Sequence, residues 1–186
     1  MRTRELPPAE MALRAYCAGI VDGEAYIGCV RLMPTPANKM TSPKYSIRIA
    51  IAMCDLEPVE AVASLLSIED RIFIRNRRSK PHHSQVFVLE IREQNAITLL
   101  RMVMPFLRGK KQQAQTMCEF YAFKKTSRKY RTKTGRTLKF KGGRQVGKSY
   151  TTRCLSDSYL KKCDAYYMAL RRRFVANNGH VARSYR

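Results

Sequence analysis

The sequence predicts an α+β fold: a four-stranded antiparallel sheet with helices covering one of its faces. Two kinds of pattern carry this prediction. Residues 45–53 and 71–78 alternate apolar with polar or small residues, which is typical of strands that bury one face. Residues 9–21, 56–66, 94–107 and 112–123 carry apolar residues at helical spacing. The predicted order is therefore helix, two strands, helix, two strands and two helices.

The first helix and the strands after it have clear boundary signals. Pro7 and Pro8 precede residues 9–21, and an acid in the first turn complements the helix dipole. A strand is expected over residues 25–32, followed by a turn-rich stretch with two prolines. Residues 45–53 form the clearest strand, because isoleucines alternate there with small or basic residues. One face of this strand belongs to the core.

The next elements repeat this scheme. The helix over residues 56–66 follows Asp55, a favourable N-cap residue. Strands are expected over 71–78 and 85–91, with a histidine-containing loop between them. His82 and His83 have no carboxylate or thiol at metal-ligand spacing, and we interpret them as loop residues. Pro105 and Gly109 separate the helices over 94–107 and 112–123.

Composition favours a polyanionic partner. The 186 residues include 36 Lys and Arg against 14 Asp and Glu, a formal charge of +22. Such an excess typically binds nucleic acid, because contacts to phosphates release condensed counterions. A membrane is a less favoured partner, because the sequence shows neither a long apolar run nor a basic amphipathic helix.

The six cysteines contain no C-x-x-C pair, which argues against a zinc finger or a disulfide scaffold. Residues 1–8 contain no apolar core of a signal peptide, so we expect an intracellular location. The cytoplasm of a prokaryote and an organelle matrix (chloroplast or mitochondrion) both fit this expectation.

Charge also suggests how the chain is divided. Residues 124–155 are rich in Lys and Arg and contain no acid, which is typical of a solvated, mobile segment. We expect a core over residues 1–123, a basic loop segment over 124–155, and a C-terminal helix and tail over 156–186.

The most informative stretch is residues 17–25, Cys-Ala-Gly-Ile-Val-Asp-Gly-Glu-Ala. Small residues at Ala15, Ala18 and Gly19 lie three and four positions apart on one helical face, where a second helix could approach closely. Glu24 follows at the end of the helix, where two copies would bring their carboxylates together. The nonapeptide resembles the signature helix of the LAGLIDADG homing endonucleases, with Cys17 in place of the first Leu and Ala25 in place of the last Gly.

This resemblance implies a homodimer, since we find only one signature helix. It implies metal-dependent hydrolysis of both strands of duplex DNA across the minor groove, with Mg²⁺ or Mn²⁺. Glu24 corresponds to the metal-binding catalytic acid, with Gly23 beside it in the metal site. Lys110 resembles the basic residue that the family places near the active centre, and it is the second catalytic candidate. The dimer interface would contain Ala15, Ala18, Gly19 and Asp22. Asp22 is expected to accept hydrogen bonds from backbone amides near the helix junction.

Strict alternation along the strands predicts a nucleic-acid-binding face. Its arginines and glutamine suit base recognition in a major groove, and exposed aromatic residues usually meet a partner. The predicted residues are Tyr26, Gly28, Val30, Ser46, Arg48, Ala50, Phe73, Arg75, Arg77, Gln85 and Phe87.

One departure from the family leaves two other functions open. Met53 and Cys54 stand where many relatives place a polar group at the end of the second strand, and Met cannot orient a water molecule. An RNA maturase that binds structured intron RNA, or a purely structural nucleic-acid-binding protein, are the alternatives. Glu24 favours the endonuclease.

Overall fold

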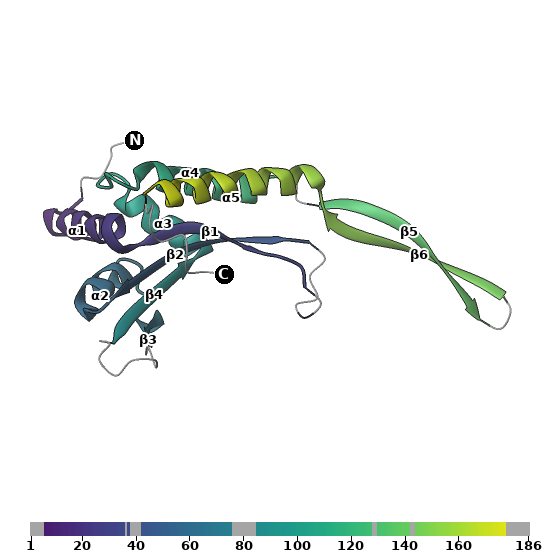
Figure 1. Ribbon diagram of the computed structural model, residues 1–186, viewed down its shortest axis with the longest axis horizontal. Helices are drawn as coiled ribbons and strands as arrows, with labels where there is room; N and C mark the ends of the chain where they lie inside the picture. Colours follow the sequence, from purple (N-terminus) through teal and green to yellow (C-terminus); the bar gives the residue numbers. More distant parts are fainter. Residues whose placement is uncertain are drawn as a thin grey trace.

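The elements follow the predicted order and then continue into two more strands and a last helix (Figure 1). The computed structural model describes residues 6–35, 37, 42–75, 85–127, 130–141 and 144–177. The elements are α1 (Pro8–Glu24), β1 (Tyr26–Leu32), β2 (Lys44–Met53), α2 (Leu56–Ser64), the 3₁₀ turn η1 (Glu69–Arg71), β3 (Ile72–Arg75), β4 (Val86–Arg92), α3 (Glu93–Val103), α4 (Lys111–Thr126), β5 (Tyr130–Lys141), β6 (Arg144–Leu155) and α5 (Asp157–Asn177).

The first four strands form one antiparallel sheet in the order β1-β2-β4-β3. The register pairs Gly28 with Arg48 and Ile49 with Ile91. Residues of opposite parity therefore face opposite sides of the sheet across all four strands. The predicted α+β fold, with an open four-stranded antiparallel sheet, is confirmed.

One face of the sheet forms the core with the helices. Ile47, Ile49 and Ile51 of β2 are fully buried, and so are Leu89 and Ile91 of β4. Burial of each such side chain contributes about 1.5–3 kcal/mol. The alternating isoleucines thus fix which side of the sheet receives the helices.

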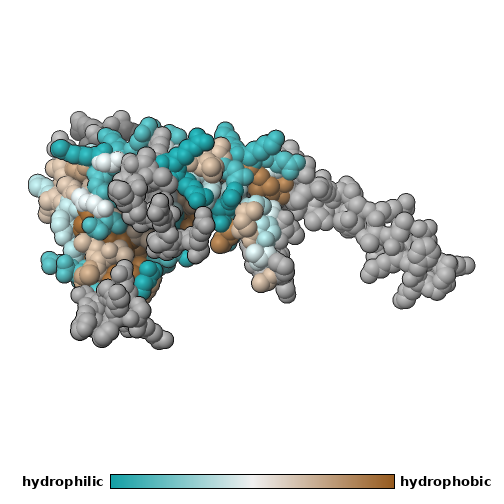
Figure 2. All heavy atoms as spheres, in the orientation of Figure 1, coloured by the Kyte–Doolittle hydropathy of each residue, from teal (hydrophilic) through white to brown (hydrophobic). Residues whose placement is uncertain are grey.

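Helices α4 and α5 pack along each other through aromatic rings. The ring centroids of Phe120 and Tyr166 lie 5.1 Å apart, and those of Phe123 and Tyr159 lie 5.4 Å apart. Cys163 and Leu170 of α5 belong to the same buried cluster as the sheet. The outer surface over these two helices is largely hydrophilic (Figure 2). Helix α5 is therefore part of the main core.

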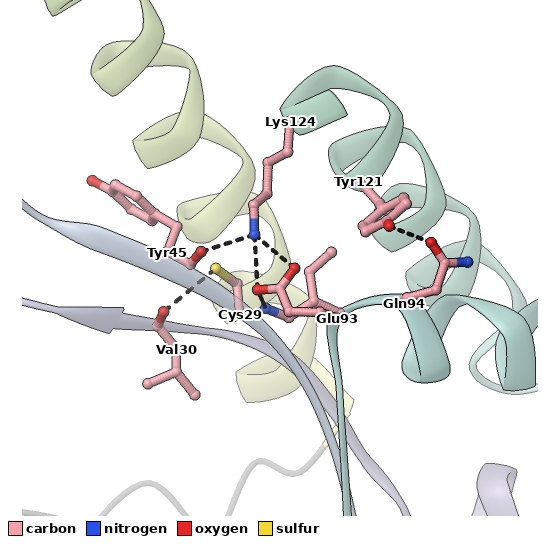
Figure 3. Close-up of polar contacts among 8 residues, drawn as sticks. Cys29, Val30, Tyr45, Glu93, Gln94, Tyr121 and Lys124 are labelled. Carbon is pink, nitrogen blue, oxygen red and sulfur yellow. Dashed lines mark hydrogen bonds and ion pairs between the residues drawn. The ribbon is translucent and has the colours of Figure 1, made fainter. Parts of the chain in front are cut away.

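A charged corner joins β2 to the start of α3 and the end of α4 (Figure 3). The β2–β4 register ends at Arg48 and Arg92, and Glu93 then turns the chain with a φ of 48°. Its carboxylate accepts the N–H of Ile47 at 3.2 Å, so a side chain replaces the missing strand partner. Lys124 completes the corner by donating to both Glu93 oxygens at 2.9 Å and to the Tyr45 carbonyl at 3.0 Å.

The basic segment does not form the predicted loop. Strands β5 and β6 pair without interruption from Tyr130 and Leu155 to Lys141 and Arg144, and the resulting two-stranded ribbon extends away from the body (Figure 1). The prediction gave charge more weight than β-propensity. The segment also contains many threonines, together with Val146 and three aromatic residues, and these residue types favour strands.

Two of the predictions concern residues 76–84, which lie outside the described ranges: the end of the strand with Arg77, and the loop with His82 and His83. Among the helices that the structure describes, none has the length and apolar character needed to cross a lipid bilayer.

Candidate active site and nucleic-acid interface

Helix α1 divides its small residues between two faces. Cys17, Ala18 and Val21 are buried against the core, and the Cys17 thiol donates to the Ala61 carbonyl of α2 at 3.4 Å. Ala15 and Gly19 lie on the opposite, exposed face, and apart from the adjacent backbone of α1 itself nothing lies within 4 Å of a Cβ added at Gly19. The assignment of Ala18 to a dimer interface is therefore wrong, because its helical position points into the core of its own chain.

Exposed residues continue along this outer face of α1. Tyr16 is 52% exposed and Met11 is 45% exposed. The exposed face, defined by Met11, Ala12, Ala15, Tyr16, Gly19 and Gly23, is called the α1 face below. It combines small residues that permit close approach with two large apolar side chains at its border.

Asp22 ties the end of α1 to the start of α4. Its Oδ2 accepts the N–H of Arg108 at 2.7 Å and that of Gly109 at 3.2 Å, and its Oδ1 accepts the N–H of Lys110 at 2.8 Å. These amides lie at the N-terminal, positive end of α4, where a carboxylate is favourable. The expected role of Asp22 as an acceptor for backbone amides is thus observed.

Lys110 makes the reciprocal contact. Its Nζ donates to the carbonyls of Val21 at 3.0 Å and Ala25 at 2.8 Å, with Gly23 at 3.4 Å. Burial lowers the pKa of Lys110, while the nearby charges of Asp22 and Glu24 act in the opposite direction. The ammonium group therefore neutralises the negative end of α1 and lies close to Glu24.

Glu24 is the last residue of α1, and its side chain is exposed. Ala25 follows in an extended conformation and is 3% exposed, so the chain is anchored directly after the acid. Within the described ranges, no three His, Cys, Asp or Glu residues lie close enough to hold a metal ion together. One chain therefore contributes a single solvent-exposed carboxylate, that of Glu24, at this point.

The open face of the sheet contains most of the predicted nucleic-acid contacts. The register places Tyr26, Gly28 and Val30 of β1 opposite Ala50, Arg48 and Ser46 of β2, and it places Phe73 and Arg75 of β3 on the same side through Val88 and Val86. Phe73 is 43% exposed. The Tyr26 ring lies across Gly28, where an added Cβ would come within 2.2 Å of the tyrosine oxygen.

The sequence interpretation missed an acid on this face. Glu90 lies opposite Ala50 and forms ion pairs with Arg48, at 3.0 Å, and with Arg92. Glu90 therefore compensates two arginines and holds them in place. The alternation of β4 contains the signal that could have found it, since Glu90 and Arg92 share a parity opposite to that of Leu89 and Ile91.

The same alternation corrects Phe87. This residue pairs with Met53 and Ile74 on the helix-covered side and packs against the core. Its prediction as part of the open face is wrong, because Phe87, Leu89 and Ile91 share one parity. Gln85 precedes β4 and is exposed, but it lies outside the paired register.

A polar cluster closes the edge of β1 against α5. Arg31 donates to Asp164 at 2.7 Å, and the Tyr45 hydroxyl donates to the same oxygen at 2.6 Å. These hydrogen bonds, that of Tyr45 before that of Arg31, lower the pKa of Asp164. The Arg31 guanidinium also lies 4.9 Å from the centre of the Tyr167 ring. An open cavity of about 320 Å³ lies beside this cluster, between β1 and α5.

Comparisons with known proteins find similarity in structure alone. No known family profile matches the chain, and no curated protein sequence matches it. In contrast, 47 chains of solved structures match. Those described next are homing endonucleases, the class that the signature helix resembles.

Three of them illustrate the extent of the similarity. I-CvuI in complex with the I-CreI target is 14% identical with a TM-score of 0.46, covering 63% of this chain and 71% of its own. The LAGLIDADG homing endonuclease I-LtrWI bound to target DNA is 18% identical with a TM-score of 0.47, covering 62% and 38%. The group I intron-encoded I-CeuI complexed with DNA is 15% identical with a TM-score of 0.42, covering 66% and 58%.

Proposed function

We propose that this chain is a site-specific, double-strand DNA endonuclease of the homing type that acts as a homodimer. The observation that carries the proposal is the end of α1, where Asp22 and Lys110 brace a helix that presents Glu24 to solvent beside the α1 face. In this proposal residues 1–123 are the endonuclease core, and α5 packs against them as part of the same buried cluster. The enzyme acts in a prokaryotic cytoplasm or an organelle matrix.

Dimerisation through the α1 face would bring the Glu24 side chains of two subunits together. Ala15 and Gly19 allow two helices to approach closely, and Tyr16 and Met11 supply apolar area that a monomer leaves in water. Two copies packed in this way bring Glu24 next to Glu24 of the partner subunit. The arrangement places two carboxylates at one point on a two-fold axis.

The donor set at this point fits a hard divalent cation, since Mg²⁺ is commonly bound by one or two carboxylates together with substrate phosphates. Glu24, with the Gly23 carbonyl beside it, would hold Mg²⁺ or Mn²⁺, which supplies an activated water and charge stabilisation at the scissile phosphate. Lys110 keeps a positive charge next to this acid. Asp22 fixes the position of the helix end and does not touch the substrate.

The open face of the sheet would follow the DNA on both sides of the cleavage point. Arg48 and Arg75 suit guanine, while Tyr26, Val30, Ala50 and Phe73 offer apolar surface for thymine methyl groups. Ser46 and the exposed Gln85 add polar contacts. Glu90 restrains Arg48, so less side-chain entropy is lost when that arginine meets a base.

One observation favours a second function. Met53 ends β2 near the helix-covered side and is half-buried, with exposed Cys54 after it. Neither residue is suited to orient a nucleophilic water. A maturase that binds structured intron RNA without cutting DNA is the candidate that this substitution favours.

The test is cleavage of a library of duplexes carrying candidate intron-insertion sites, with Mg²⁺ or Mn²⁺ and with a chelator. We expect wild-type cleavage to need the cation, and Glu24→Gln to lose it while retaining fold and DNA binding, because the charge is lost but the size is kept. Glu60→Gln, which removes an exposed acid of α2, is the matched control and should cut normally. Equal cleavage by wild type and Glu24→Gln would refute the catalytic assignment.

Binding without cleavage by the wild type would point to the second function. The same chain should then bind a structured intron RNA more tightly than duplex DNA at matched salt, since the general phosphate contribution is common to both.

A further inference from the structure

The ribbon of β5 and β6 is long and basic, and its two strands pair without a bulge or a gap in the register. Each strand has 12 residues, and the pairing continues from the ends of α4 and α5 to Lys141 and Arg144 at the tip. At about 3.4 Å per residue the ribbon reaches about 40 Å. Figure 1 shows it projecting away from the sheet and helices.

The register separates the charged residues by face. Successive residues of a strand lie on opposite faces, and directly paired residues share a face. One face carries six basic residues, and we call it the basic ribbon face: Arg131, Lys133, Lys139, Lys141, Arg144 and Lys148. The other face carries two, Arg136 and Arg153, together with Tyr130, Leu138, Phe140 and Leu155.

Nothing in the ribbon sequence balances this charge. No acid occurs between Glu119 and Asp157, so the ribbon contains no internal counterion. Lys141 and Arg144 are directly paired across the strands, which is an unfavourable arrangement for two like charges. A polyanion lying along this face would remove the repulsion, whereas a neutral or basic partner would not.

We infer that the basic ribbon face is a second duplex-DNA docking surface, separate from the open face of the four-stranded sheet. The inference rests on the proposed DNA-directed function and deepens it. A two-stranded ribbon is narrow enough to enter a major groove, and its length corresponds to about one helical turn of about 34 Å. The contacts are to phosphates, so they add affinity and carry no sequence information.

The two faces allow a test in which two variants lose the same number of positive charges. Lys133→Gln with Lys139→Gln removes two charges from the basic ribbon face, and Arg136→Gln with Arg153→Gln removes two charges from the other face. The probe is a fluorescent 40-bp DNA duplex of random sequence, titrated at several salt concentrations. Thermal unfolding of both double variants checks that the fold is retained.

We expect a loss from the basic-face variant only. Removing two phosphate contacts should weaken binding about 30-fold near 0.15 M salt and should flatten the slope of log K against log salt by about 1.8. The other-face variant should bind as the wild type does. Equal losses in both variants, or no loss in either, would overturn the inference.

Two further measurements test whether the ribbon binds DNA or RNA and whether it acts in binding or in cleavage. A 40-bp RNA duplex should show a smaller difference between the variants than DNA; a larger one would overturn DNA as the occupant. Cleavage at saturating protein should be the same in the other-face variant and in wild type, because Arg136 and Arg153 lie outside the basic ribbon face. If no duplex is ever cleaved yet binding still depends on the basic ribbon face, the proposed function fails and the inference stands.

Discussion

Asp22 lies two positions before Glu24 in the sequence, and Lys110 lies close to Glu24 in space. The side chains of Asp22 and Lys110 are nevertheless both hydrogen-bonded to backbone groups. Asp22 accepts three amides at the start of α4, and Lys110 donates to carbonyls at the end of α1. Each charge stands at the helix end of opposite sign. The pair therefore sets the position of Glu24 without competing with it.

Asp22→Asn should act on folding. The amide keeps one acceptor oxygen but loses the charge, and its NH₂ group faces backbone donors, so we expect a loss of about 1–3 kcal/mol in the free energy of unfolding. Urea denaturation measures this loss. Glu24→Gln, at an exposed position, should change the same free energy by less than about 0.5 kcal/mol. A reversed order of these two losses would contradict the structural role of Asp22.

Asp164 gives a prediction for pH. Tyr45 and Arg31 lower its pKa in the folded chain below the ordinary aspartate value of 3.8. Its contribution to stability is therefore present above that value and is lost as the pH falls through the folded pKa. Asp164→Asn should therefore be less stable than wild type at pH 7. The difference should shrink in acid, as followed by urea denaturation from pH 7 to pH 3. A difference that grows in acid would exclude this linkage.

At the scale of elements, Gly19→Leu tests the α1 face. The structure leaves open space at this position within one chain, so the monomer should fold normally, apart from the gain in helix propensity. Two packed helices would overlap at a leucine, at a cost of about 1–3 kcal/mol or more. Sedimentation should show wild-type dimers and Gly19→Leu monomers, with Glu60→Leu on α2 as the control. A wild-type monomer that binds its target with full affinity would exclude the dimer.

The sequence predicted elements better than faces. The alternating isoleucines of β2 and the helical spacing of α1 to α4 determine the fold, because each pattern has one period and one buried side. Ala18 and Phe87 were assigned to the wrong sides for a different reason. A small residue suits both a core and an interface. Phe87 was grouped with the exposed Gln85, although it shares its parity with the buried Leu89 and Ile91.

Long-range polar partners were harder to predict. Glu93 takes the N–H of Ile47 only because β4 ends one residue earlier, and Lys124 reaches Tyr45 across 79 positions. Glu90 and Arg92 could be found from the alternation of β4, but the ion pair of Glu90 with Arg48 requires the strand register. The ends of α1 and α4 illustrate the same limit, since the Asp22 acceptor was predicted but the reciprocal contact of Lys110 was not.

At the scale of the whole molecule, the ribbon and the core are separable. The core is held by buried residues of the sheet and of α1 to α5, including Phe120 and Cys163. Aromatic contacts join α4, which precedes the ribbon in the sequence, to α5, which follows it. Stability should therefore reside in the core, and a large part of the nucleic-acid affinity in the ribbon.

Replacing residues 130–154 by a short Gly-Ser linker tests this division and keeps Leu155, which packs against the core. The thermal midpoint should stay within a few degrees of wild type, because the linker leaves the α4–α5 contacts intact. Affinity for duplex DNA should fall at low salt, since eight positive charges are removed with no acid. Phe120→Ala provides the opposite result: it should cost about 3–5 kcal/mol of stability while the charge is unchanged. A ribbon-deleted chain that no longer folds would show that the ribbon belongs to the core, and one that binds DNA undiminished would show that the sheet alone carries the affinity.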